Sequence, residues 1–227
     1  MHQTLTLQRG KAALLLIDMQ EEHRCDTRYL VHDYSKITTH CARLLVAARA
    51  AAMPVLHSVY LVDNIDGPTR PFHPIGQNGR SAFSDAGSTG SEISPELAPR
   101  ADEVVIVKRD ASCFTALALM EAMQLLGVDW LIVGGCWAEA CVAATVKDGV
   151  ERGVHMLLVK DACGSGSQAM QETAVLNIAN RIYGGGVVDT ARALTLIAGG
   201  PTQVWQPKLP VPIKFTYESA PRDYAAL

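Results

Sequence analysis

Short apolar runs alternate along this chain with longer segments in which apolar residues recur at helical spacing. The runs are nearly continuous in valine, leucine and isoleucine, as in strands that helices cover on both faces. Because strands that alternate with helices form βαβ units, the pattern predicts an α/β fold: a six-stranded, mostly parallel sheet of Rossmann-like order between two layers of helices. The runs are 12–17, 55–59, 104–107, 130–133 and 154–159, and Val187 and Val188 begin a sixth.

Helical spacing is clearest in three segments between these runs. Apolar residues share one face across 37–52 and another across 114–125. A third helix is expected at about 139–152, where Gly153 supplies a stop.

Two segments depart from this alternation. Residues 62–96 contain turn signals such as Asp66-Gly67-Pro68 and Asn78-Gly79, and their length indicates a binding loop. From Pro201 the sequence is apolar but irregular. We expect this tail to lie extended across another surface or a neighbouring subunit, and a frayed terminus is the alternative. With no internal repeat, a single domain is expected to span 1–227.

Composition narrows the possible partners. Of 227 residues, 48% are hydrophobic and 19% charged, which is enough to form a core and excludes general disorder. The net charge is −3 and no basic block occurs, so nucleic acid is an unlikely partner. The longest early apolar run, 12–17, is far shorter than the ~20 residues that span a bilayer, and no leader precedes it. We therefore expect a cytoplasmic protein without a membrane partner.

The six cysteines do not form the framework of a small secreted domain, and reduced thiols are expected. No pair has CxxC spacing, and Cys136 with Cys141 lacks a second pair of ligands nearby. We therefore predict neither a metal nor another cofactor.

Three chemically different residues follow apolar runs, where open parallel sheets bind their ligands. Asp18 ends AALLLID, Lys108 ends EVVIVK, and Cys141 lies one short turn after DWLIVGG, at the start of the third helix. A helix N-terminus and the ammonium of Lys108 would both favour a thiolate, and Asp18 can accept the thiol proton and return it to a departing amine. Backbone amides in the turn 135–138 are placed to stabilise an oxyanion. Together these groups predict acyl transfer to sulfur.

Each residue also has a purely structural interpretation. An aspartate after a strand is commonly a cap or turn former, and a lysine there commonly reaches solvent. Cys141 on an alanine-rich helix could be a small core residue. The combination of the three residues, rather than any one of them, favours catalysis.

Four motifs in this order resemble those of the isochorismatase-like cysteine hydrolase superfamily, which includes nicotinamidases, N-carbamoylsarcosine amidases and isochorismatase itself. The resemblance covers roughly residues 12–198. LLLIDMQ resembles the strand that carries the family's aspartate, and GSTGSEISPEL resembles the loop before the third strand. VIVKRDASCF resembles the lysine motif, and GGCWAEACVAAT resembles the motif of the nucleophile.

The resemblance implies a triad of Asp18, Lys108 and Cys141 and a thioester intermediate formed with release of ammonia or an amine. It also implies a cis peptide between Cys136 and Trp137, which turns the Trp137 amide, with that of Cys141, toward the oxyanion. A homo-oligomer, either a dimer or a tetramer, is implied as well.

Two departures from the family pattern affect the expected substrate. The threonine three residues before the nucleophile is Ala138 here, and bulky Trp137 stands where the family usually has a small residue. The metal-binding aspartate and histidines of nicotinamidases are not found around His57 to His73, so a metal-dependent nicotinamidase is disfavoured.

The sequence therefore predicts a cysteine amidohydrolase that acts on a small amide, carbamoyl or ureido compound. Two alternatives remain: a vinyl-ether hydrolase of the isochorismatase type, in which Asp18 is the acid and Cys141 is a spectator, and a non-enzymatic interaction protein on the same fold. Residues expected to shape the substrate pocket are Gln20, Tyr60, Phe83, Phe114 and Trp137, although core packing is the alternative for each aromatic residue.

Overall fold

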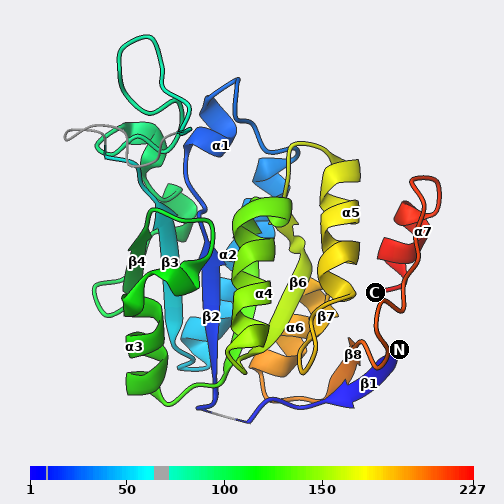
Figure 1. Ribbon diagram of the computed structural model, residues 1–227. Coiled ribbons are helices and arrows are strands. Elements are labelled where there is room, and N and C mark those ends of the chain that lie inside the picture. Colours follow the sequence, from blue (N-terminus) through cyan, green and yellow to red (C-terminus); the bar gives the residue numbers. More distant parts are fainter. Residues whose placement is uncertain (9, 64–71) are drawn as a thin grey trace.

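The computed structural model describes residues 1–8, 10–63 and 72–227. A single sheet of eight strands runs through the molecule in the order β1-β8-β7-β6-β5-β2-β3-β4 (Figure 1). Six consecutive strands of this sheet, from β7 to β4, are parallel: β2 (Ala12–Ile17), β3 (Val55–Tyr60), β4 (Val104–Lys108), β5 (Trp130–Cys136), β6 (His155–Gly164) and β7 (Gly186–Val188). The α/β class and the six expected strands are confirmed.

The sheet is wider than the sequence pattern predicted, because two antiparallel strands extend one edge. Strand β8 (Thr202–Trp205) pairs with β7, and β1 (His2–Leu5) pairs with β8 in the register His2 to Trp205. Of these two strands, β8 contains the buried residues Val204 and Trp205, whereas every residue of β1 is at least partly exposed. Such short, half-exposed edge strands carry no long apolar run to reveal them.

Helices cover both faces of the sheet, and the alternation of side chains along β2 separates the two cores. Ala13, Leu15 and Ile17 face the layer of α3, α4 and α5, while Leu14 and Leu16 face the layer of α2 and α6. The helices are α1 (Glu22–Cys25), α2 (Tyr34–Ala50), α3 (Leu117–Leu126), α4 (Ala143–Glu151), α5 (Gln168–Ala179), α6 (Thr190–Ile197) and α7 (Ala220–Ala225). The predicted helices correspond to α2, to α3 with the short 3-10 turn Cys113–Thr115 before it, and to α4 with the π-helical turn Ala138–Val142 before it.

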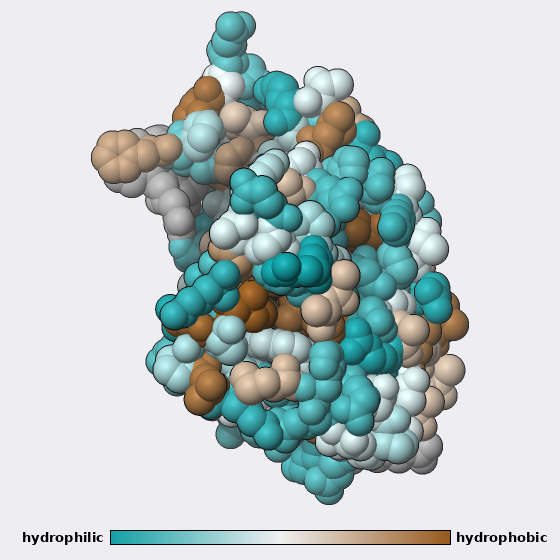
Figure 2. All heavy atoms as spheres, turned by 90° about the vertical axis from the view of Figure 1, so that its right-hand side faces the viewer, coloured by the Kyte–Doolittle hydropathy of each residue, from teal (hydrophilic) through white to brown (hydrophobic). Residues whose placement is uncertain are grey.

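The segment after Pro201 folds back on its own chain. It forms β8 and then α7, which packs beside α5 at the side of the molecule that carries β1 and β8 (Figure 1). Ala220 and Leu227 are buried there, and Lys160 Nζ donates a 2.7 Å hydrogen bond to the carbonyl of Tyr224. Viewed from this side, hydrophilic side chains cover most of the surface (Figure 2). The sequence predicted an extended tail, but the segment forms a strand and a helix, because burial of its apolar residues against the body of the protein stabilises them.

The chain between β3 and β4 is held to the body of the molecule at several points. Its described parts contain the 3-10 turns Thr89–Ser91 and Pro95–Leu97, and isolated bridges join Gln20 to Ile93 and Val62 to Asp85. The predicted turn at Asp66-Gly67-Pro68 lies outside the described residues. No helix in the described part of the chain has the length and apolarity that a membrane span requires.

One glycine is required where β5 passes β2. Gly135 has a φ of +134°, and a Cβ placed on it would lie 2.0 Å from the carbonyl oxygen of Ile17. Any side chain there would displace β2 immediately before Asp18.

Candidate active site

The three residues predicted to carry the chemistry converge at the carboxyl ends of the central strands. Lys108 Nζ lies 2.6 Å from Asp18 Oδ2 and 3.4 Å from Cys141 Sγ. The side chains of Asp18 and Lys108 are almost fully buried, at 4% and 0% exposure. A buried ammonium therefore bridges a carboxylate and a thiol.

Strand order explains how these residues meet. β5 and β2 are neighbours, so Asp18 and the turn that carries Cys141 are adjacent, but β3 separates β2 from β4. Lys108, the last residue of β4, reaches across the end of β3, where its Nζ lies 4.9 Å from the centre of the Tyr60 ring. The site is therefore assembled across three neighbouring strand ends and the end of β4 beyond them.

The backbone of Asp18 is unusual and well supported. Its φ is +48°, a region that residues other than glycine seldom adopt, although aspartate tolerates it better than most. Its amide donates to the carbonyl of Ser58, and its own carbonyl lies 3.0 Å from His23 Nε2. The Ser58 hydroxyl donates a 2.7 Å hydrogen bond to Oδ1 of the same aspartate. The carboxylate is thus fixed in one orientation.

Electrostatics favour a neutral thiol in the resting site. Burial raises the pKa of Cys141, and the nearby Asp18 carboxylate raises it further, while Lys108 acts in the opposite direction. Burial is the largest single influence on the pKa of Lys108 and would lower it, but the Asp18 carboxylate together with Cys141 and Cys113 more than offsets burial, and the pKa is raised. The site therefore holds an ammonium, a carboxylate able to accept a proton, and a thiol able to give one.

Cys141 lies in an irregular helical turn. The π-helical turn Ala138–Val142 precedes α4, and the carbonyl of Trp137 accepts hydrogen bonds from the amides of Ala140 and Val142. The peptide bond between Cys136 and Trp137 is cis.

A cavity of about 190 Å³ opens beside the thiol. A row of stacked aromatic rings forms part of its wall: the Tyr29 ring stacks on Trp137 at 4.8 Å and on Phe83 at 5.1 Å between centroids, and Phe83 stacks on Tyr60 at 6.0 Å. Small side chains near the thiol leave room for a ligand. The lining residues are Asp18, Gln20, His23, Tyr29, Tyr60, Phe83, Ser84, Ala111, Trp137, Ala140 and Cys141.

Four of the five residues expected to shape the substrate pocket line this cavity. They are Gln20, Tyr60, Phe83 and Trp137. The side-chain amide of Gln20 is hydrogen-bonded to backbone groups of Tyr60 and Ser91, so it ties the segment before α1 to the end of β3 and to the turn Thr89–Ser91 as well as lining the cavity.

The structure places Phe114 elsewhere. Its ring is 5% exposed, belongs to the core under α3 and α4, and lies 5.4 Å from the guanidinium of Arg152. The core interpretation therefore applies to this aromatic residue, because the short 3-10 turn after β4 directs it into the helix layer and away from the cavity.

Sequence reasoning missed four residues at the site. Tyr29, His23 and Ser84 line the cavity, and Ser58 bonds the carboxylate. His23 is 98% buried, and this burial lowers its pKa to about 4, so the imidazole is neutral at pH 7. Of these four residues, only Ser58 could have been noticed in the sequence, because it is a polar residue inside an apolar strand.

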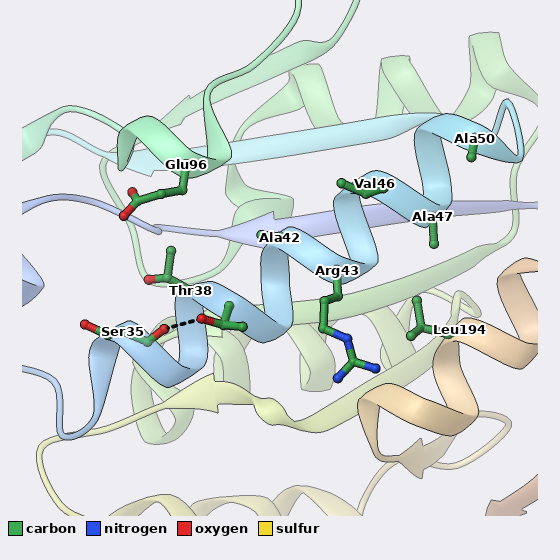
Figure 3. A pocket seen from close by; sticks show the side chains of 10 residues that line it. Ser35, Thr38, Ala42, Arg43, Val46, Ala47, Ala50, Glu96 and Leu194 are labelled. Carbon is green, nitrogen blue, oxygen red and sulfur yellow. Dashed lines mark hydrogen bonds between the residues drawn. The ribbon is translucent and has the colours of Figure 1, made fainter.

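A larger hollow lies away from this chemistry. It has a volume of about 640 Å³ and follows the outer face of α2, where Ala42, Val46 and Ala47 line it together with Arg43, Glu96 and Leu194 (Figure 3). It contains no thiol and no buried carboxylate. Within the described residues, no group of three or more histidine, cysteine or acidic side chains is arranged to hold a metal ion.

Comparison with known proteins agrees with this arrangement. The family model described as the isochorismatase domain matches residues 12–192. The chain belongs to the isochorismatase family. An uncharacterized member of this family from Bacillus subtilis is 29% identical over 164 residues, which cover 72% of this chain and 83% of that protein.

One further sequence relative and one solved structure are also similar to this chain. Maleamate amidohydrolase of Pseudomonas putida is 30% identical over 105 residues, 45% of this chain and 49% of that enzyme. The crystal structure of a cysteine hydrolase from Pseudomonas syringae pv. phaseolicola superposes with a TM-score of 0.74 over 86% of this chain and 95% of that one, at 24% identity. This isochorismatase-family chain therefore has the fold of a family of hydrolases, some of which act on amides.

Proposed function

We propose that this isochorismatase-family protein is a cysteine amidohydrolase that cleaves a small amide, carbamoyl or ureido compound through a thioester intermediate. The observation that carries the proposal is the position of Lys108 Nζ, 2.6 Å from Asp18 Oδ2 and 3.4 Å from Cys141 Sγ, where both of these partners line a cavity. The likeness to an amidohydrolase supports the same reaction class.

In the first step Asp18 accepts the proton of the Cys141 thiol as the sulfur attacks the substrate carbonyl carbon. The raised pKa of Cys141 makes this transfer necessary, since little thiolate exists beforehand. Lys108 stabilises the sulfur anion as it forms. The carbonyl oxygen becomes an oxyanion, to which the backbone amides of Trp137 and Cys141 donate hydrogen bonds.

The tetrahedral intermediate then collapses with loss of the nitrogen. The C–N bond breaks, the departing nitrogen takes the proton from Asp18, and ammonia or an amine leaves the acyl group bonded to Cys141. Water attacks this thioester with Asp18 as the base, and the acid product and the free thiol are released. A cavity of about 190 Å³ with stacked aromatic rings in its wall suits a small acyl group with an apolar or flat body.

The test is ammonia release from a panel of small amides, carbamoyl amino acids, ureides and nicotinamide, with wild type and Cys141→Ala measured together. Release by the wild type that Cys141→Ala lacks would support the thiol mechanism and identify the substrate class. Equal release by both proteins would contradict it and favour a reaction in which Asp18 acts as an acid while the thiol is a spectator.

A further inference from the structure

The aromatic wall of the cavity is completed by one residue from the loop before β4. Phe83 lies parallel to Tyr29, with an interplanar angle of 29°, and to Tyr60, at 26°. Tyr29 follows α1 and Tyr60 ends β3, so Phe83 stacks between rings from two separate elements that both line the cavity. Because Phe83 and Cys141 line the same cavity, the position of this ring affects the space available beside the thiol.

The next residue, Ser84, is anchored by a single carboxylate. Its amide donates a 2.6 Å hydrogen bond to Glu22 Oε2, and its hydroxyl donates one of 2.6 Å to Glu22 Oε1. Both oxygens of Glu22 are thus used by one residue that lies 62 positions further along the chain. Hydrogen bonds to an ionised acceptor are about twice as strong as neutral ones.

The conformation of Ser84 needs such an anchor. Its φ is +52°, in the left-handed region that residues other than glycine seldom adopt. Strained conformations of this kind persist where surrounding contacts hold them. Glu22 supplies two of those contacts, and the carbonyl of Ser84 accepts a third hydrogen bond from the amide of Val62.

Glu22 itself has an uncommon environment for an acid outside the reacting triad. It is 5% exposed, and burial raises its pKa although the bonds from Ser84 act against the rise. A buried carboxylate is costly unless its partners compensate. Here both oxygens accept hydrogen bonds from Ser84, in the loop that presents Phe83.

We propose that Glu22 is a positioning residue that sets substrate specificity: by fixing Ser84 it holds Phe83 against Tyr29 and Tyr60 and limits the size of the acyl group that reaches Cys141. This inference rests on the proposed role of Cys141 as the nucleophile. The substrates it selects are small acyl groups that fit under the Phe83 ring, and bulkier amides are excluded.

The test measures access to the thiol and needs no known substrate. Cys141 is alkylated with iodoacetamide and, separately, with the bulkier N-(1-naphthyl)iodoacetamide, and the rate at each cysteine is read by peptide-mapping mass spectrometry. Exposed Cys25 serves as the internal reference. In the wild type we expect the bulky reagent to be strongly disfavoured at Cys141 and not at Cys25.

In Glu22→Gln the amide nitrogen cannot accept a hydrogen bond, so one anchor is lost, and the ratio of bulky to small reagent at Cys141 should rise about 10-fold, equivalent to about 1.4 kcal/mol. Glu21→Gln is the matched control, because Glu21 is the adjacent acid, is partly exposed and pairs with Arg24 instead of the loop. Its ratio should equal that of the wild type.

Two more variants keep the proposal testable if Glu22→Gln fails to fold. Ser84→Ala removes only the hydroxyl bond and should raise the ratio in the same direction. In a Phe83→Ala background, where the wall is already absent, Ser84→Ala should add nothing. An unchanged ratio in both Glu22→Gln and Ser84→Ala, or an equal rise in Glu21→Gln, would overturn the proposal.

The two proposals fail in different ways. Ammonia release that is unchanged in Cys141→Ala would refute the thiol mechanism, whatever the alkylation ratios are. If the ratio of bulky to small reagent at Cys141 does not change when Glu22 is replaced, its role in specificity is refuted and the thiol mechanism still stands. With an identified substrate, Glu22→Gln should raise KM for that substrate more than it lowers kcat, and it should improve kcat/KM for amides with larger acyl groups.

Discussion

The hydroxyl of Ser58 donates a 2.7 Å hydrogen bond to Oδ1 of Asp18, so that the other oxygen of this carboxylate is left to Lys108. Both residues are almost fully buried. One neutral donor and one charged donor thus divide the two oxygens of the proposed base between them, which fixes the plane of the carboxylate relative to the thiol.

Loss of this hydroxyl should slow the reaction without unfolding the protein. A hydrogen bond to a charged group contributes about 1.5–3 kcal/mol, so Ser58→Ala should lower kcat by about 10- to 100-fold. Ammonia release and thermal unfolding would be measured together. Ser35→Ala on the exposed face of α2 is the control and should behave as wild type. A wild-type rate in Ser58→Ala would show that the orientation of Asp18 does not depend on this bond.

Removal of the buried ammonium should affect stability and activity together. Lys108→Met leaves Asp18 buried without its ionic partner, and breaking such a pair costs about 3–5 kcal/mol of unfolding free energy. Urea denaturation measures this loss, and turnover should be abolished. Asp18→Asn/Lys108→Met should regain much of the stability and none of the activity, whereas exposed Lys147→Met should change neither. Full stability in Lys108→Met alone would contradict a buried ion pair.

The thiol of the free enzyme should titrate at high pH. Burial raises the pKa of Cys141, so the rate of its alkylation by iodoacetamide should keep rising through pH 9. Because Asp18 contributes to the rise, Asp18→Asn should move the alkylation profile to lower pH, with Cys25 followed in the same samples as the exposed reference. A plateau near neutral pH in the wild type would mean that the thiolate forms before substrate binds, and Asp18 would not be the first proton acceptor.

Buried His23 should make the protein sensitive to mild acid. Its pKa is lowered from 6.5 to about 4 in the folded state, so the unfolded chain binds more protons between these values and the unfolding free energy falls as the pH falls from about 6.5 to 4. A shift of this size corresponds to about 3 kcal/mol. Denaturant titrations across this range measure it.

His23→Asn should remove much of that slope. Some slope will remain, since burial also lowers the pKa of His57 in the same direction. The exposed His32→Asn is the control and should keep the full slope. An unchanged slope in His23→Asn would show that another group causes the acid sensitivity.

The sequence was sufficient for the features that depend on continuous apolar runs. The run at 12–17 coincides with β2, and the residues that follow three such runs do converge, because the carboxyl ends of parallel strands lie at one edge of a sheet. Helix α5 was not predicted, since its buried residues are spread around the helix and it shows no single apolar face.

The parts that were not predicted depend on contacts between distant segments. Glu22 and Ser84 have no local pattern that pairs them, and Phe83 becomes a cavity wall only after the loop is folded over α1. Phe114 shows the opposite case, since an aromatic residue close to a motif was directed into the core by a turn of three residues. Strand ends could be predicted, but side-chain directions in irregular segments could not.

The anchoring of Phe83 through one carboxylate separates the chemistry of this enzyme from its choice of substrate. Asp18, Lys108 and Cys141 are attached to the central strands and their first turns, whereas Phe83 and Ser84 belong to a surface loop. Loops accept insertions and exchanges far more readily than buried strands do. Grafting a different loop between β3 and β4, together with a matching residue at position 22, is therefore a route to new amide specificities that leaves the reacting groups untouched.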